Sequence, residues 1–333
     1  MKSITYYATA NVLKLPGVSS KIKQFVSSAS RLGYEAQYCF AEPGVRGQLG
    51  LAWSMVRRRD SFIVFRCPLL TAWLYVLPCV LARLRGVRVI LDVPTPLGIS
   101  LLELARDRDR RLLYRILSVS AVVVSYPLAL WPASLVVEYS EESRWFRVPR
   151  PWLLAGNGID TNAVAARASE PVMAEDALRL VSVSSMAFWH GCDRLVRSLA
   201  AYRPAPGQPT VELLFIGDGP GLQPLRSLSE RLGVSEKVAF AGQLTGGALD
   251  EAYEGCHAAV ASLGLYRKRL NLASELKVRE YACKGLPIIL SAEDADLRPP
   301  PSFALKVPND PSLLDVGRIV AWLRSSFPKG YSV

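Results

Sequence analysis

The feature that most constrains the fold is a regular order of short apolar runs, turns and helical segments in the second half of the chain. Apolar runs lie at 178–183, 211–216, 238–242, 258–261 and 288–290, and glycines stand in most of the turns between them. Strands that alternate with helices in this way form a parallel sheet with helices on both faces. The sequence therefore predicts a doubly wound α/β domain whose ligand binds at the carboxyl ends of the strands.

The first half of the chain repeats this order. A helix is expected to begin at Ser19 or Ser20 and to end at Gly33. The uncharged run 67–82 is shorter than the roughly 20 residues that span a bilayer and contains two prolines, so we expect a buried helix whose end can touch a membrane. Since 333 residues suffice for two domains, we expect a second α/β domain here, with strands at 4–8, 35–40, 61–65, 87–92, 121–125 and 135–138.

The charge of the chain is concentrated in its first half. Residues 1–150 carry 21 Lys and Arg against 10 Asp and Glu, which accounts for the whole net charge of +11. A basic domain of this kind favours a polyanion or an anionic membrane surface as partner. No nucleic-acid-binding motif accompanies the charge, so we expect no nucleic-acid partner.

The cysteines and the first residues indicate the compartment. The six cysteines are scattered, without a CxxC pair or a histidine at ligand spacing, which argues against a zinc site or a disulfide framework and fits a reducing compartment. The start MKSITYYATANV has no apolar core of a secretory signal. We expect a cytoplasmic protein, in part peripheral on the inner face of the membrane.

The stretch 262–291 has an unusual distribution of charge. A cationic loop at 267–269 precedes a short helix expected at 275–284, with Ser274 as N-cap and Gly285 as stop. Lys277 falls near the positive end of this helix, where the macrodipole disfavours cations. A phosphate or diphosphate held at the helix N-terminus explains this arrangement, and a solvated basic loop is the alternative.

This stretch resembles the donor-binding signature of GT-B glycosyltransferases of the family-4 kind. The residues Glu280 to Pro287 correspond to its E-A-M-A-C-G-x-P motif. The chain is most similar to a bacterial surface-polysaccharide subgroup with the patterns SLGxxR…S-x-LKxREY and WHGxDRL, which residues 262–281 and 189–195 match. The resemblance implies two doubly wound Rossmann-like domains that face a central cleft. It also implies retaining, metal-independent transfer of a sugar from a nucleotide-sugar, in the first place a UDP-sugar, to a surface-polysaccharide or lipid-linked glycan acceptor.

The domain boundaries follow from the same resemblance. Asn157-Gly158-Ile159-Asp160 is similar to the turn that leads to the interdomain linker in this enzyme class. We expect an acceptor-side domain at 1–165, a donor domain at 166–311 and a C-terminal helix at 312–333 that crosses back to the first domain.

The resemblance also implies the roles of particular residues in the donor domain. Glu280 would bind the ribose hydroxyls, while Lys277, Arg267 and the helix start at Ser274, Glu275 and Leu276 would bind the diphosphate. Leu272 replaces the leading glutamate of the family's paired motif, so Glu275 or the loop must orient the sugar. The other expected donor contacts are Gly217, Asp218 and Gly219 around the base and Leu244 at the edge of the base pocket. Gly17, in the first domain, is expected near the phosphates.

Three positions leave alternatives open. His190 replaces the lysine that clamps the diphosphate in the wider family, and it either faces phosphate or is a structural, hydrogen-bonded histidine. The first domain has no histidine, so Asp92, at the start of a D-x-P-T-P turn, is the nearest candidate for acceptor contact. Asp294 and Asp296 imitate a DxD metal motif, but we expect a loop there. A non-catalytic GT-B subunit and a nucleotide-sugar epimerase are the alternative functions.

Overall fold

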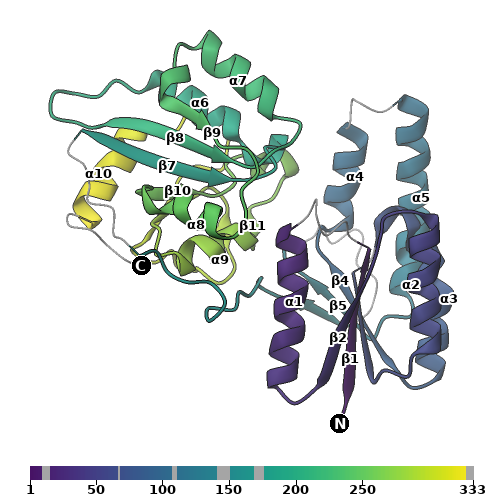
Figure 1. The fold of residues 1–333 in the computed structure, drawn as a ribbon. Coiled ribbons are helices and arrows are strands. Elements are labelled where there is room, and N and C mark those ends of the chain that lie inside the picture. Colours follow the sequence, from purple (N-terminus) through teal and green to yellow (C-terminus); the bar gives the residue numbers. More distant parts are fainter. Residues whose placement is uncertain (10–15, 67, 107–110, 141–150, 169–175, 328–333) are drawn as a thin grey trace. The chain divides into compact units, whose positions relative to one another are not determined.

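The computed structural model describes residues 1–9, 16–66, 68–106, 111–140, 151–168 and 176–327. Contacts divide the chain into two units, Met1–Asp160 and Thr161–Val333, so that the division falls five residues before the predicted boundary. Each unit contains one six-stranded parallel sheet with helices on both faces. The predicted pair of doubly wound α/β domains is therefore confirmed (Figure 1).

The sheet of the first unit has the strand order β2-β1-β3-β4-β5-β6. Its strands are β1 (Ser3–Thr9), β2 (Glu35–Ala41), β3 (Phe62–Arg66), β4 (Arg88–Val93), β5 (Leu135–Glu138) and β6 (Trp152–Leu154). Its helices are α1 (Pro16–Arg31), α2 (Val45–Arg57), the 3-10 helix η1 (Leu69–Tyr75), α3 (Val76–Leu84), α4 (Leu97–Arg106) and α5 (Leu112–Leu130). Figure 1 shows α1 on one face of the sheet and α2 and α3 on the other.

Alternate residues of β1 explain the two cores of this unit. Tyr6 packs with Ile22 and its neighbours on α1, whereas Tyr7 packs with Met55 of α2 and Phe65 of β3 in the larger core. This alternation is the period of two that a strand between two helical layers requires.

Two sequence-based expectations for the first unit were wrong, and a third, a buried helix at 67–82, was confirmed only in part. Residues 121–125 are not a strand but part of α5, because buried residues recur at helical spacing and pack on one face: Ser118, Val122, Ser125, Tyr126 and Ala129. The first helix begins at Pro16 rather than at Ser19 or Ser20, in keeping with the preference of proline for the first helical turn. The run 67–82, of which Cys67 lies outside the described residues, is η1 followed by α3, and it exposes Trp73 and Leu77.

The sheet of the second unit has the order β14-β12-β10-β7-β8-β9. Its strands are β7 (Ala177–Val183), β8 (Thr210–Ile216), β9 (Val238–Phe240), β10 (Ala258–Val260), β12 (Ile288–Leu290) and β14 (Ala304–Lys306). β11 (Leu272–Ala273) and β13 (Glu293–Asp294) form a separate two-stranded sheet. The α-helices are α6 (Cys192–Ala201), α7 (Leu222–Arg231), α8 (Gly247–Glu254), α9 (Leu276–Cys283) and α10 (Val316–Ser326). Three short 3-10 helices are η3 (Phe188–His190), η4 (Ser235–Lys237) and η5 (Leu265–Lys268). The strand order reverses between β7 and β10, and such a switch point is where doubly wound sheets bind ligands.

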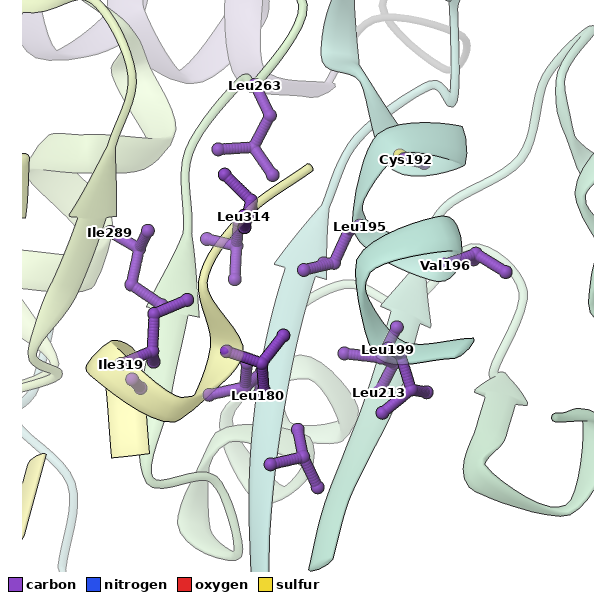
Figure 2. Close-up of a cluster of buried hydrophobic side chains, with 14 of the residues drawn as sticks. Leu180, Cys192, Leu195, Val196, Leu199, Leu213, Leu263, Ile289, Leu314 and Ile319 are labelled. Atoms are coloured by element: carbon purple, nitrogen blue, oxygen red, sulfur yellow. The ribbon is translucent and has the colours of Figure 1, made fainter. Parts of the chain in front are cut away.

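The C-terminal helix α10 belongs to the core of the second unit. Figure 2 shows Leu314 and Ile319 of the C-terminal segment beside Leu180 and Ile289 of the sheet, and Leu323 is fully buried in the same cluster. The expected crossing back onto the first domain concerns contacts between the units and stays a prediction.

Side chains fasten both ends of the segment that joins the units. Asp160 accepts a hydrogen bond from Arg31 of α1 at 2.9 Å, and its backbone N–H donates to Gln24 at 3.1 Å. Arg167 donates to the carbonyl oxygens of Cys256, Lys284 and Gly285 at 2.7, 3.0 and 2.8 Å. The chain between these two anchors is residues 161–166.

Candidate active site

Three turns at the carboxyl ends of β7, β8 and β10 pack backbone against backbone. Gly217, with φ +125°, lies so close to Ser184 that a Cβ atom would collide with its carbonyl oxygen. Gly191, with φ +67°, leaves 2.6 Å between an added Cβ atom and the backbone nitrogen of Gly264. Only glycine fits positions that combine this conformation with such an approach. The sequence predicts the turns but not their mutual contact, which depends on the sheet order.

The start of α9 is fastened to the loop that follows β10. The Glu275 carboxylate accepts hydrogen bonds from the backbone N–H of Ser262, at 3.1 Å, and from the Ser262 hydroxyl. Glu275 is the N-cap residue, so the expected cap at Ser274 is wrong. The Ser274 hydroxyl instead accepts a hydrogen bond from Arg279 at 2.8 Å, because that guanidinium lies one turn along the helix. Leu276 is the first helical residue and is half-buried.

Lys277 is a buried cation in the first turn of α9. Its side chain is 12% exposed, and its Nζ lies 3.5 Å from a Glu275 carboxylate oxygen. In the part of the chain that the structure describes, this Nζ has no hydrogen-bond partner. A buried ammonium group loses its hydration, so an anion beside it would restore the missing hydrogen bonds. The first N–H groups of α9 also lack intrahelical acceptors and favour an anion at the same end.

His190 lies beside this lysine as a neutral ring. Burial, with the nearby charges of Lys277 and Lys268, lowers the pKa of His190 from 6.5 to about 2. Its Nδ1 accepts a hydrogen bond from the backbone N–H of Ala187 at 3.0 Å. The ring proton therefore resides on Nε2, which is a hydrogen-bond donor. The Nδ1 atom therefore has the structural, hydrogen-bonded role that was one of the two alternatives. Contact of Nε2 with phosphate stays a prediction.

Arg267 is held by an ion pair that sequence reasoning missed. Its guanidinium donates to both carboxylate oxygens of Asp193, at 2.8 and 2.9 Å, and to the carbonyl oxygen of Phe188 at 2.6 Å. Arg194, which is buried, donates to the carbonyl oxygens of Leu263, Pro308 and Ser312. The WHGxDRL motif therefore joins the β7 turn to the loop after β10. The spacing of the two motifs carried no signal for the Asp193–Arg267 pair.

Glu280 is half-buried on α9, one helical turn beyond Lys277. Tyr253 of α8 donates a hydrogen bond to one Glu280 carboxylate oxygen at 3.1 Å. Burial raises the pKa of Glu280, against the lowering effects of this hydrogen bond and of Lys284. Residues three apart on a helix are neighbours, so α9 presents the lysine and the carboxylate together.

The remaining predicted donor residues of this unit lie on neighbouring turns. Gly217 and Gly219 follow β8, and between them the exposed Asp218 accepts a hydrogen bond from the backbone N–H of Gly219 at 2.7 Å. Leu244 follows β9 and packs against the buried cluster that contains Tyr253. Asp294 and Asp296 both accept hydrogen bonds from Arg279, and Asp294 falls in the short strand β13 rather than in a loop.

In the first unit, Asp92 lies at the end of β4 among groups that the sequence did not connect with it. It is 1% exposed, and one carboxylate oxygen accepts hydrogen bonds from the Tyr6 hydroxyl and, at 3.4 Å, from Arg66. The Nζ of Lys21 lies 3.9 Å from the other oxygen, and burial lowers the pKa of Lys21 to about 8, against the effect of Asp92. Gly17 lies one turn before Lys21 on α1, exposed, with no atom near its missing Cβ position.

Comparisons with known proteins support the reading of the second unit. Residues 168–292 match the family "Glycosyl transferases group 1". A search of curated protein sequences gave no significant match. The matched range contains the glycine turns, Lys277 and Glu280.

Several solved structures have the same fold. Sucrose-phosphate synthase from Thermosynechococcus elongatus is 16% identical, with a TM-score of 0.69 over 98% of this chain and 92% of that chain. Anabaena Alr3699/HepE in complex with UDP-glucose is 13% identical, with a TM-score of 0.62 over 98% and 89%. WaaG, a glycosyltransferase involved in lipopolysaccharide biosynthesis, is 11% identical, with a TM-score of 0.55 over 99% and 91%. These likenesses confirm the predicted GT-B fold.

Proposed function

We propose that this chain, a glycosyltransferase with the GT-B fold, transfers a sugar from a UDP-sugar to a surface-polysaccharide or lipid-linked glycan acceptor with retention of anomeric configuration. The Anabaena protein has been crystallised with UDP and with UDP-glucose, which supports this choice of nucleotide. WaaB and WaaG, both enzymes of lipopolysaccharide, support a glycan acceptor.

The observation that carries the proposal is the buried ammonium group of Lys277 at the start of α9. It has no hydrogen-bond partner among the described residues, and the N-terminal end of the helix adds partial positive charge. A diphosphate bound here would satisfy both. Negative charge grows on the diphosphate as the sugar leaves, so fixed donors at this place stabilise the transition state more than the bound substrate.

Other residues of the site have distinct parts in this proposal. The Glu280 carboxylate accepts hydrogen bonds from the ribose hydroxyls, and Tyr253 holds it in place. The Nε2 of His190 donates a hydrogen bond to the donor without adding charge. Arg267 acts through Asp193 by positioning the turn after β7, because its guanidinium already makes a bidentate ion pair. Glu275 likewise holds the loop at Ser262. No step of this proposal uses a metal ion.

The proposed setting is the cytoplasmic side of a membrane. The excess of positive charge lies entirely in residues 1–150, which form most of the first unit. In that unit the cluster of Lys21, Arg66 and Asp92 lies at the carboxyl edge of the sheet. We assign this cluster to the acceptor.

A ligand titration tests the donor site. Thermal unfolding is followed with UDP-, GDP-, dTDP- and ADP-sugars for the wild type, Lys277→Met, Glu280→Gln and the control Lys306→Met, which changes an exposed lysine of the same unit. A UDP-sugar at 100 times its Kd should stabilise the wild type and the control by about 2.7 kcal/mol. Loss of a charge-assisted hydrogen bond should weaken binding by Lys277→Met roughly tenfold to hundredfold.

Three results would each overturn a part of the proposal. Equal binding by Lys277→Met and the wild type would remove the diphosphate from α9. Binding without turnover on any glycan acceptor would favour a non-catalytic subunit, and a product of inverted configuration would refute retention.

A further inference from the structure

Helix α5 is apolar on the face that it turns away from the core. Leu112–Leu130 has a mean hydropathy of 1.6 over an 18-residue window, of which 28% is buried. On its first two turns Leu112, Leu113, Ile116 and Leu117 are 66%, 68%, 54% and 60% exposed. A surface helix of a soluble domain normally has polar residues on its outer face. This exposed apolar face is therefore a candidate contact surface.

The other face of α5 rules out a membrane span. Val122, Tyr126, Ala129 and Leu130 are buried in the core of the first unit, where α5 packs against η1. The final turns cannot leave that core without unfolding it. Only the beginning of the helix can enter a bilayer, and Leu112 to Leu117 cover about 9 Å of helix axis, far less than the roughly 30 Å of a hydrocarbon core.

The surroundings of this face fit lipid. Tyr114 is 44% exposed on the first turn of α5, and Leu70, Trp73 and Leu77 of η1 and α3 are further exposed apolar residues of this unit. Aromatic side chains with a polar edge prefer the boundary between lipid and water. Arg111 occupies the N-cap position of α5, and the first 150 residues carry the whole net charge of +11. That charge complements anionic headgroups.

We propose that the first two turns of α5 insert into the interface of an anionic bilayer and hold the first unit on its surface. This inference rests on the proposed function and gives its membrane-associated setting a definite anchor. Helix α4, which stands beside α5 (Figure 1), begins at Leu97, five residues after Asp92. Helix α4 therefore links the Lys21–Asp92 cluster to the anchor, which would hold this cluster near a lipid-linked acceptor.

Vesicle flotation tests the anchor. The full chain is mixed with vesicles of equimolar phosphatidylglycerol and phosphatidylcholine, or of phosphatidylcholine alone. The variants are the double substitution Leu113→Glu with Leu117→Glu, and the control Leu32→Glu, which adds a charge at a leucine 77% exposed at the end of α1. The wild type and control should float with the mixed vesicles and less with phosphatidylcholine. The double variant should lose binding at least tenfold, since it buries two charges in place of two leucines.

Each contrary result is decisive. Absence of the wild type from both kinds of vesicle, or equal flotation of the double variant, refutes the anchor. A wild-type dimer that the double variant dissociates, measured by light scattering without lipid, would assign the face to a second copy. Stabilisation by a UDP-sugar is measured in parallel. If the double variant no longer floats but is still stabilised by the UDP-sugar, it is folded and has lost only the anchor. If the wild type floats but binds no nucleotide-sugar, the proposed function alone is refuted.

Discussion

At the scale of single residues, the site combines two lysines with a histidine that stays neutral. The Nδ1 of His190 is occupied by the Ala187 N–H, and Lys277 and Lys268 oppose its protonation. The neutral ring donates a directional hydrogen bond from its Nε2–H and adds no positive charge. His190 therefore keeps the same protonation state throughout the physiological pH range.

This neutrality predicts how stability depends on pH. The pKa of His190 is lowered from 6.5 to about 2 in the folded protein, so below pH 6.5 the unfolded chain binds one more proton there than the folded one. Stability attributable to this group is complete above pH 6.5 and falls as the pH decreases, by at most about 1.4 kcal/mol per pH unit. His190→Gln, which retains an acceptor and a donor, should show a shallower loss in urea unfolding measured above and below pH 6.5. Parallel curves for variant and wild type would contradict the neutral histidine.

Sequence reasoning identified the groups of the site better than their partners. Lys277 and Glu280 lie together on α9, as the motif spacing implies. The partner of Arg267, Asp193, lies 74 residues away in sequence, and the strand order that brings them together is not visible in local spacing. Ser274 is a residue type that favours the N-cap position, but its hydroxyl accepts a hydrogen bond from Arg279 instead.

At the scale of elements, the WHGxDRL turn and the loop after β10 form one unit. The Asp193–Arg267 pair, the buried Arg194 and the contact of Gly191 with Gly264 all cross between them. Helix α9 begins directly after this loop and is fastened to it by Glu275. The orientation of the helix N-terminus, where we propose that the diphosphate binds, therefore depends on residues that need not touch a ligand.

A double-mutant cycle separates positioning from direct contact. If Arg267 acts only through Asp193, then Arg267→Gln, Asp193→Asn and the double substitution should weaken UDP-sugar binding equally, with a coupling of about 1 kcal/mol for this partly exposed pair. A further loss on adding Arg267→Gln to Asp193→Asn would mean that the guanidinium touches the diphosphate. Isothermal titration of the four proteins measures the cycle.

Helix α5 shows where local signals fail for a whole element. The β-branched run at Val122, Val123 and Val124 is typical of a strand, and a strand was predicted there. Burial at helical spacing across Ser118, Val122 and Tyr126 decides the outcome, because it fills the core against η1. The parallel order of the other strands was predictable, since each is bounded by turns and helices of ordinary length.

At the scale of the whole molecule, each unit has cores of its own. The residues of the second unit's main core, including those of α10, all come from that unit, and the same is true of the first unit's core. Units with separate cores unfold as separate cooperative blocks unless a large interface joins them.

Calorimetry of the full chain should therefore show two transitions, and UDP should raise the midpoint of one. The expected shift belongs to the second unit, because ligand binding stabilises only the block that contains the site. Lys277→Met should abolish the shift and leave the other transition unchanged. A shift of both transitions, or a single transition, would show that the units unfold together.

Because Asp160 and Arg167 are both held by hydrogen bonds, the connection between the units is short and fixed at each end. Asp160 is hydrogen-bonded to α1, the helix that carries Lys21. Arg167 is hydrogen-bonded to carbonyl groups at the end of α9, the helix that carries Lys277 and Glu280. Arg167 lies seven residues after Asp160, and a fully extended chain of that length reaches only about 25 Å. The length of this connection therefore limits how far its two anchoring sites can separate, and tension in it would act on the end of α9.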